Sequence, residues 1–433
     1  MEEGGRGMSA VALLVLSFLA LMFFKVPISV SLALSSFFTT FYLGLPPMVM
    51  VQRMADPLDN ISLMAIPFFI MAGQIMTESG IAKKLVDFSN IFVGHVRGGL
   101  SFANIVASMF FGGMSGSSVA DTASIGSVLI PEMVRHGYDR DYSIAVTVTS
   151  STEGLVIPPS HNAIIYAYAA GGLSIARLFL AGAIPGILIG LCLMVPAYVI
   201  AVREGYPTVP RIKGKEALKI ALDSLWGLFT IVIILGGVLS GVFTATESSV
   251  VAVIYALLIA TFVYKGLSRD GFFRVLRESL TTAAAVLFLI SSATAFAWLL
   301  AYLKVPDAVA EAILRVSHNK YAVLLLINVV LLFLGMIMDM APLILITTPI
   351  FLPVVKQVGV DPIHFGVIMM MNLGIGLCTP PVGNALFVGC VVGKRKIEQV
   401  TKAMFPFYAA IVGALFLVTY VPPIAMWLPS LLR

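Results

Sequence analysis

Charge is the property that this sequence has least of. Only 11% of its 433 residues are Asp, Glu, Lys or Arg, whereas 59% are hydrophobic and the mean hydropathy is +1.01. Because a soluble domain usually carries about a quarter of charged residues, this composition excludes a soluble protein of the same length. Apolar runs of about 20 residues, long enough to cross a hydrocarbon core, recur along the chain. The sequence therefore predicts an all-α polytopic membrane protein without a sizeable soluble domain.

Residues that carry cofactors or metals are also scarce. The three cysteines lie in apolar segments without C-x-x-C or Cys/His spacing, so neither a transition-metal site nor a disulfide is expected, and no cofactor is predicted. The chain has no G-x-x-x-x-G-K-[ST] stretch, which argues against ATP-driven transport by this chain. The first apolar run lacks an A-x-A-like cleavage site, so we interpret it as a retained helix and not as a signal peptide.

Ten segments are long and apolar enough to be predicted as membrane spans, at roughly 8–24, 27–44, 60–78, 141–168, 178–200, 225–241, 247–264, 281–303, 363–388 and 404–428. Two further apolar stretches, 104–134 and 321–357, are too long for one span and too interrupted for two. Each is predicted to form a re-entrant hairpin. The first tip is expected at Gly112-Gly113 with Ser115–Ser118, and the second at 335–342.

The sequence also repeats itself after 222 residues. At this offset Gly and Pro landmarks coincide without gaps: Gly113 with Gly335, Pro131 with Pro353, Gly154 with Gly376, Pro158-Pro159 with Pro380-Pro381, and Gly171 with Gly393. The backbone geometry of these residues is hard to replace. Each repeat holds five spans and one hairpin, so the second copy must be inserted upside down. We predict a first inverted repeat at 1–202, a cytoplasmic basic connector at 203–222 and a second repeat at 223–433.

The basic residues test this topology independently. With the N-terminus and the C-terminus outside, most of the 27 Lys and Arg residues fall in inside loops, as the positive-inside rule requires. The first hairpin would then enter from the cytoplasm and the second from the opposite face. Orientation alone explains the basic connector, although a role in binding lipid headgroups stays an alternative.

Each repeat has a polar interruption inside a predicted span. In the first, Ser150–Gly154 precedes Pro158-Pro159, and in the second, Asn372–Gly376 precedes Thr379-Pro380-Pro381. Broken helices expose backbone carbonyls that can coordinate a cation, and a half-helix N-terminus suits an anion. Matching breaks in inverted repeats indicate the midplane site of a secondary transporter. Each break is expected to face the hairpin tip of its own repeat.

Four acidic residues lie in or near apolar segments: Asp121, Glu153, Glu247 and Asp339. A carboxylate there is a functional candidate because ionising it at membrane depth is costly. Glu153 could bind a cation or a proton, or it could cap the half-helix that follows, and the residues do not decide between these roles. Capping is the expectation for the other three. A lone histidine such as His161 is more often a hydrogen-bonded structural residue than a substrate or pH-sensing group.

At these motifs the sequence resembles the large membrane (M) subunit of tripartite ATP-independent periplasmic (TRAP) transporters of the binding-protein-dependent type. The likeness covers nearly the whole chain, and its most specific stretches are FGGMSGSSVADTASIGSVLIPEMVRHGYDR, GVFTATESSVVAVIYALL, LGMIMDMAPLILITTPIFLPV and GVDPIHFGVIMMMNLGIGLCTPPVGNALFV. It implies a sodium-coupled, elevator-type importer of a small organic anion (a dicarboxylate, keto acid or sugar acid) in a bacterial or archaeal inner membrane, with both termini periplasmic. Two partners are implied: a small four-helix membrane subunit (Q) and a soluble periplasmic substrate-binding protein (P).

The family's sodium sites pair each hairpin tip with its facing break. Carried over, sodium ligands are expected at Ser115, Ser117, Ser118, Ser150, Ser151, Thr152 and Gly154, and at Met338, Asp339, Asn372, Gly376 and Thr379. Substrate is expected at Ser118, Glu153, Ser160, His161, Asn162, Pro380 and Asn384.

This chain departs from the family pattern at two positions, and other functions compete. It has Glu153 where relatives often have an apolar residue, and His161-Asn162 where they often have Ile-Pro, so a proton could join the coupling. The alternatives are a proton-coupled carboxylate transporter and an ion channel, which would also use carbonyl ligands. An enzyme is not predicted, because no nucleophile or metal constellation accompanies Glu153 and His161.

Overall fold

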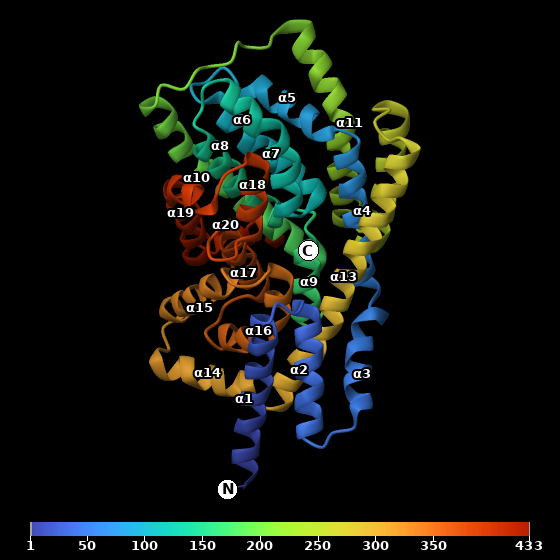
Figure 1. The fold of residues 1–433 in the computed structure, drawn as a ribbon, viewed down its shortest axis with the longest axis vertical. Helices are drawn as coiled ribbons and strands as arrows, with labels where there is room; N and C mark the ends of the chain where they lie inside the picture. The colour runs from blue at the N-terminus through green and yellow to red at the C-terminus, as the bar shows by residue number, and fades with distance from the viewer. Residues whose placement is uncertain (1, 433) are drawn as a thin grey trace.

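The computed structural model describes residues 2–432, with side chains from residue 7 onward. All regular elements of this part of the chain are helices (Figure 1). The first repeat comprises α1 (Glu2–Phe23), α2 (Ile28–Tyr42), α3 (Pro47–Ala55), α4 (Ala65–Glu78), α5 (Ile81–Val93), α6 (Gly99–Ser115), α7 (Ser118–Arg135), α8 (Arg140–Ser150), the 3-10 helix η3 (Ser151–Leu155), α9 (His161–Ala169) and α10 (Ile175–Arg203).

The second repeat follows the same order. It comprises α11 (Gly214–Leu239), α12 (Ala245–Leu258), which continues into a π-helical turn (Ile259–Val263), α13 (Arg269–Tyr302), α14 (Val305–Val316), α15 (Lys320–Gly335), α16 (Met340–Gln357), α17 (Pro362–Leu377), α18 (Asn384–Gly393), α19 (Ile397–Tyr420) and α20 (Pro423–Met426). Seven of the described helices are long and apolar enough to cross a membrane.

The internal repeat of the sequence recurs in the helices. Helix α7 covers residues 118–135 and α16 covers 340–357, which is the same 222-residue offset, and α6, α8, α9 and α10 match α15, α17, α18 and α19 in the same way. Both proline pairs also adopt the same cis peptide bond. Two hairpins and two broken helices therefore occupy equivalent places in the two halves. The boundaries of the two repeats, at residues 202 and 223, stay predictions.

Two packed regions surround the hairpins. In one, α4 packs against α12 and α13, and α13 packs against α2; α2, α4 and α13 are labelled in Figure 1. In the other, the two repeats interlock: α18 packs against α7 and α8, η3 packs against α17, and α10 packs against α19. Contacts of α13 with α16 and of α4 with α6 join the regions. The two breaks thus lie together inside the second region.

The sequence-based prediction missed three helices and overextended one. Helices α5 and α14 carry charged residues and are too short and polar for spans, which is why the search for apolar runs passed over them; α3 was missed for the same reason. Under the repeat α5 corresponds to α14, and Figure 1 shows them near opposite ends of the molecule. The last span, predicted to reach residue 428, ends at Tyr420, where Pro422-Pro423 prevent continuation.

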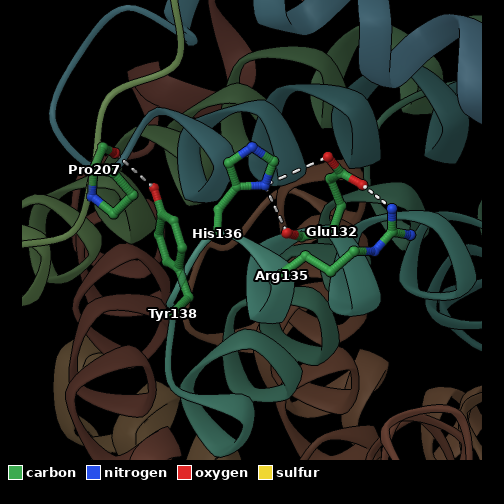
Figure 2. A network of polar contacts seen from close by, with 5 residues as sticks. All are labelled: Glu132, Arg135, His136, Tyr138 and Pro207. Atoms are coloured by element: carbon green, nitrogen blue, oxygen red, sulfur yellow. Dashed lines mark hydrogen bonds and ion pairs between the residues drawn. The ribbon is translucent and has the colours of Figure 1, made fainter.

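The connector between the repeats lies against the base of the first hairpin (Figure 2). The Tyr138 hydroxyl donates to the Pro207 carbonyl at 3.3 Å, and the Asp139 N–H donates to the Tyr206 hydroxyl at 3.3 Å. The rings of Tyr138 and Tyr206 lie 4.3 Å apart. Helix α11 then begins at Gly214, inside the stretch that was predicted as the connector.

Candidate substrate and cation site

The first hairpin turns at Gly116 and Ser117. Gly116 adopts a positive φ of 61°, and the Ser117 hydroxyl accepts from the Ala120 N–H to cap α7. The predicted tip was partly wrong, because Gly112 and Gly113 lie inside α6. The absence of a side chain is still needed at Gly112, because a Cβ there would overlap the Cα of Gly154. The hairpin arm and the break therefore touch backbone to backbone.

This close approach brings the tip to the break of its own repeat, as predicted. The Ser118 and Ser151 hydroxyls lie 2.6 Å apart, and those of Ser108 and Ser150 lie 3.1 Å apart. The break itself is a 3-10 turn, in which the Thr152 hydroxyl donates to the Thr149 carbonyl at 2.7 Å. The small polar residues thus tighten the helix and line it with hydroxyls.

Two carboxyl groups are fully buried beside this contact. Asp121 on α7 and Glu153 on η3 are each 0% exposed. The Asp121 carboxyl group interacts with the Ser108 hydroxyl, whereas neither carboxyl oxygen of Glu153 has a hydrogen-bond partner among the described residues. A Cβ on Gly190 of α10 would lie 3.0 Å from Glu153 Oε1, so the absence of a side chain there leaves room for the carboxyl group. The Asp121 carboxyl group lies close enough to Glu153 to disfavour a second negative charge there.

These positions decide the capping predictions. The prediction that Asp121 caps a helix was wrong, because Ser117, one turn earlier, caps α7. Glu153 does not cap the half-helix that follows it. Capping is confirmed for Glu247, which forms a capping box with Thr244, and for Asp339, which accepts from the Met340 N–H at 2.9 Å.

The second break lies later than predicted. Helix α17 continues through Leu377, so Asn372–Gly376 is helical, and the chain leaves the helix only at Cys378–Gly383. The Asn372 amide donates to the carbonyl and to Oδ1 of Asn328 at 2.9 and 2.7 Å, and the Thr379 hydroxyl donates to the Ile375 carbonyl at 2.7 Å. The Pro380-Pro381 pair ends the helix. Upstream of it the Asn372 amide nitrogen and the Thr379 hydroxyl are hydrogen-bonded, whereas Asn372 Oδ1 is buried without a partner among the described residues.

The second tip also meets its own break. The Val382 N–H donates to the Met336 carbonyl at 3.2 Å. The carboxylate of Asp339, at the start of α16, accepts a hydrogen bond from the side chain of Asn384, at the start of α18. Tip and half-helix are thus joined through an acidic side chain.

The corresponding half-helix of the first repeat, α9, begins beside the first tip. The Ser160 hydroxyl donates to the Leu155 carbonyl at 2.7 Å. The Asn162 side chain is 2% exposed, and neither its Nδ2 nor His161 Nδ1 has a hydrogen-bond partner among the described residues. For this ring nitrogen, the prediction of a hydrogen-bonded structural histidine was wrong.

The two breaks contact each other through residues that the sequence did not single out. The Cys378 thiol donates to the Val148 carbonyl at 3.2 Å, and the same carbonyl accepts from the Ser151 hydroxyl at 2.8 Å. The Tyr408 hydroxyl donates to the Cys378 carbonyl at 2.6 Å. No role was predicted for Cys378 from the sequence. The only hint in the sequence is the 222-residue offset, which relates Cys378 to Val156, directly after the first break.

Two inverted repeats, two hairpins and two broken helices that meet inside a polytopic membrane protein define a secondary transporter. Residues 15–424 match the family described as tripartite ATP-independent periplasmic transporter, DctM component. The chain belongs to this family of large TRAP transporter subunits and is a multi-pass inner-membrane protein.

Individual proteins agree with this assignment. The chain is 43% identical to a Salmonella typhimurium protein named uncharacterized protein YgiK, over 96% of each sequence. It is 40% identical to the C4-dicarboxylate TRAP transporter large permease protein DctM of Pseudomonas aeruginosa, over 87% of this chain and 88% of the relative. The crystal structure of the Alcanivorax borkumensis YdaH transporter has the same fold, with a TM-score of 0.63, 14% identity and 86% of each chain covered.

Proposed function

We propose that this chain carries a small organic anion together with Na⁺ across the inner membrane and into the cell. Transport of an organic acid is the function that its family and relatives support. Relatives are named as transporters of C4-dicarboxylates, of sialic acid and of 2,3-diketo-L-gulonate, all of them carboxylates at neutral pH. We therefore propose a carboxylate substrate that a periplasmic binding protein delivers. We also propose that a small membrane subunit is a partner of this chain.

The buried pair of Asp121 and Glu153 is the observation that supports cation coupling. Both carboxyl groups lie in the packed interior of a membrane protein without a basic partner among the described residues. An uncompensated carboxylate at such a site is costly, and a bound cation compensates it. The Ser118–Ser151 contact supplies hydroxyl oxygens beside the pair.

The sodium ligands that we propose are those predicted at the two tip-and-break contacts. The first set is Ser115, Ser117 and Ser118 of the tip with Ser150, Ser151, Thr152 and Gly154 of the break. The second set is Met338 and Asp339 of the tip with Asn372, Gly376 and Thr379. Unwound backbone carbonyls and half-helix ends are the groups that coordinate Na⁺ in broken-helix transporters. We further propose that the interlocked hairpins and breaks move as one body past α2, α4, α12 and α13.

Thermal unfolding in different salts tests the coupling without a partner or a known substrate. Purified protein in detergent is heated in sodium, potassium and choline chloride at equal ionic strength. A ligand that binds only the folded state stabilises it by about 2.7 kcal/mol at 100 times its Kd. We expect a rise in Tm that is specific to sodium and smaller in Ser151→Ala.

Glu247→Gln provides the control, because Glu247 is an exposed helix cap far along the chain from both breaks. It should keep the full sodium response. Equal Tm values in the three salts would contradict sodium coupling. If lower pH raised the Tm and sodium did not, the result would support the proton-coupled alternative.

A further inference from the structure

A groove of about 670 Å³ runs along the outer face of α10 and α19. The two helices pack against each other and lie side by side in Figure 1. Both are long and apolar enough to cross the membrane. Apart from Arg203, the residues that line the groove are apolar, and Val199 among them is 58% exposed. The groove therefore lies at the depth of the lipid acyl chains and is open to them.

Small residues of α19 line this groove. At the 222-residue offset, Ala409 and Gly413 correspond to Ile187 and Leu191 of α10, which are exposed large side chains. A Cβ on Gly413 would meet nothing within 4 Å among the described residues, so no packing contact requires glycine there. Glycine also disfavours a helix interior relative to alanine. The groove is thus open at Gly413 although the stability of α19 does not call for glycine.

Arg203 marks one end of the groove. It is the last residue of α10 and lines the groove, and its side chain is 83% exposed. The Arg203 Nε lies 3.8 Å from Glu204 Oε1. An exposed ion pair of this kind contributes little, so the guanidinium group stays available to another anion.

Lys402 lies at the same end. It is exposed and precedes the first groove-lining residue of α19 by one helical turn, so both lie on one face of the helix. The start of α19 lies beside the end of α10, because the start of α8 contacts both. Asp141 forms an ion pair at 3.0 Å with Arg395, just before α19. The Asp139 N–H donates at 3.3 Å to the hydroxyl of Tyr206, just after α10.

An apolar groove with two cations at its membrane-surface end is complementary to an anionic phospholipid. Lys and Arg at the membrane surface attract anionic headgroups, and an acyl chain fits an apolar groove between membrane-spanning helices. Orientation accounts for basic residues at this end, which is predicted to be cytoplasmic, but it does not account for a groove that opens beside them. A transmembrane helix also fits a groove lined by small residues, but it has no need of the cations.

We propose that one anionic phospholipid binds this groove, with an acyl chain between α10 and α19 and its phosphate between Arg203 and Lys402. The lipid covers apolar surface that the protein itself leaves open. This site is independent of the proposed function, because it requires neither Na⁺ nor a carboxylate substrate.

The first test titrates lipid into the purified protein. Protein in dodecylmaltoside and potassium chloride is heated with increasing dioleoylphosphatidylglycerol or dioleoylphosphatidylcholine, and the lipid concentration that gives half of the Tm rise is recorded. We expect a lower concentration for phosphatidylglycerol. Arg203→Gln/Lys402→Gln should raise it about 30-fold, because each basic residue near an anionic lipid surface contributes about fivefold. Equal concentrations for the two lipids in the wild type would overturn the proposal.

Lys213→Gln/Lys215→Gln provides the matched control. It removes the same charge from exposed residues at the start of α11, outside the groove. Its response to phosphatidylglycerol should equal that of the wild type. If both double variants lost the response equally, attraction to the whole basic face would explain the binding, and the groove site would be refuted.

The second test fills the groove. Gly413→Leu introduces the side chain that the equivalent position of α10 carries. Because the space is open, the Tm without lipid should not fall, whereas the Tm rise with phosphatidylglycerol should be lost. Gly236→Leu on α11 is the control, since a Cβ there also meets nothing within 4 Å among the described residues. An undiminished response in Gly413→Leu, or the same loss in Gly236→Leu, would contradict the proposal.

The potassium salt of glycerol phosphate distinguishes a lipid from a soluble anion. It offers the phosphate without an acyl chain, so it should leave the Tm unchanged. A Tm rise equal to that with phosphatidylglycerol would show that the two basic residues bind a soluble anion and that the groove is not a lipid site.

Discussion

The two breaks share a backbone plan but differ in how their polar groups are satisfied. In the second repeat Asn372 bonds to Asn328, and Asp339 bonds to Asn384. At the second break Asn372 Oδ1 is the one buried atom of these residues without a partner, whereas in the first repeat both carboxyl oxygens of Glu153 and the amide nitrogen of Asn162 have none among the residues described. A satisfied network is rigid, whereas unpaired buried groups depend on what binds to them. The difference indicates that the first half depends more on bound ligands than the second half does.

The largest effect should come from the glycine crossings that hold each tip against its break. A Cβ on Gly112 would overlap the Gly154 backbone, whereas a Cβ on Gly335 would lie 3.2 Å from the Gly376 Cα. We expect Gly112→Ala to lower stability by about 3 kcal/mol or more and Gly335→Ala by about 1 kcal/mol. Unfolding of both variants in detergent measures this. Equal losses would mean that the two crossings are equally tight in solution.

The next effect concerns the buried carboxyl pair. If a cation compensates it, Asp121→Asn and Glu153→Gln should each remove most of the sodium-dependent stabilisation, which is about 2.7 kcal/mol at 100 times the Kd. Asp339→Asn should remove less, because its neighbours satisfy the carboxylate without a ligand. Sodium titrations followed by Tm provide the measurement. A larger loss in Asp339→Asn would reverse the assignment of the two halves.

The smaller effect of the contact between the breaks can be isolated at Cys378. Its thiol donates to the Val148 carbonyl, so Cys378→Ala should cost about 1 kcal/mol, and Cys378→Ser, which keeps a donor, should cost less. Denaturant unfolding of the three proteins compares them directly. If alanine and serine behave alike, the thiol contributes by packing and not by its hydrogen bond.

Most of the fold could be predicted, because it depends on the length of the apolar segments and on the repeat of the sequence. The spans, both hairpins and the repeat follow from apolar runs and from Gly and Pro landmarks. The offset even related α5 to α14, but both helices are too short and polar for a search based on membrane spans. Amphipathic pattern was the signal that could have found them.

The site could be located but not resolved into pairs. The sequence placed Ser118 near Ser151, and Asp339 near the second break, because tips and breaks recur together. It could not foresee that Asn328 would accept from the Asn372 amide within a continuous helix α17, since that contact joins residues 44 positions apart. Nor could it foresee which acidic residue caps a helix, because that depends on whether the helix begins one turn before the acidic residue or at it.

The smallest expected effect distinguishes the bases of the two hairpins. Tyr138 ties the first base to the connector through the Pro207 carbonyl, whereas the equivalent residue of the second base is Val360, which has no hydroxyl. Burial raises the pKa of Tyr138 to about 12, so its hydroxyl stays protonated and donates throughout the neutral range. Tyr138→Phe should therefore lower stability by about 0.5–1 kcal/mol.

Because the pKa of this phenol is raised in the folded state, its contribution is complete below the ordinary pKa of about 10 and is lost only as the pH rises through 12. The difference between wild type and Tyr138→Phe should thus be constant from pH 6 to 9 in thermal unfolding. Val360→Ala serves as the matched change in the other base, and its cost should come from lost packing alone. A Tyr138→Phe difference that varied across this pH range would show that the hydroxyl is not the group that fastens the connector.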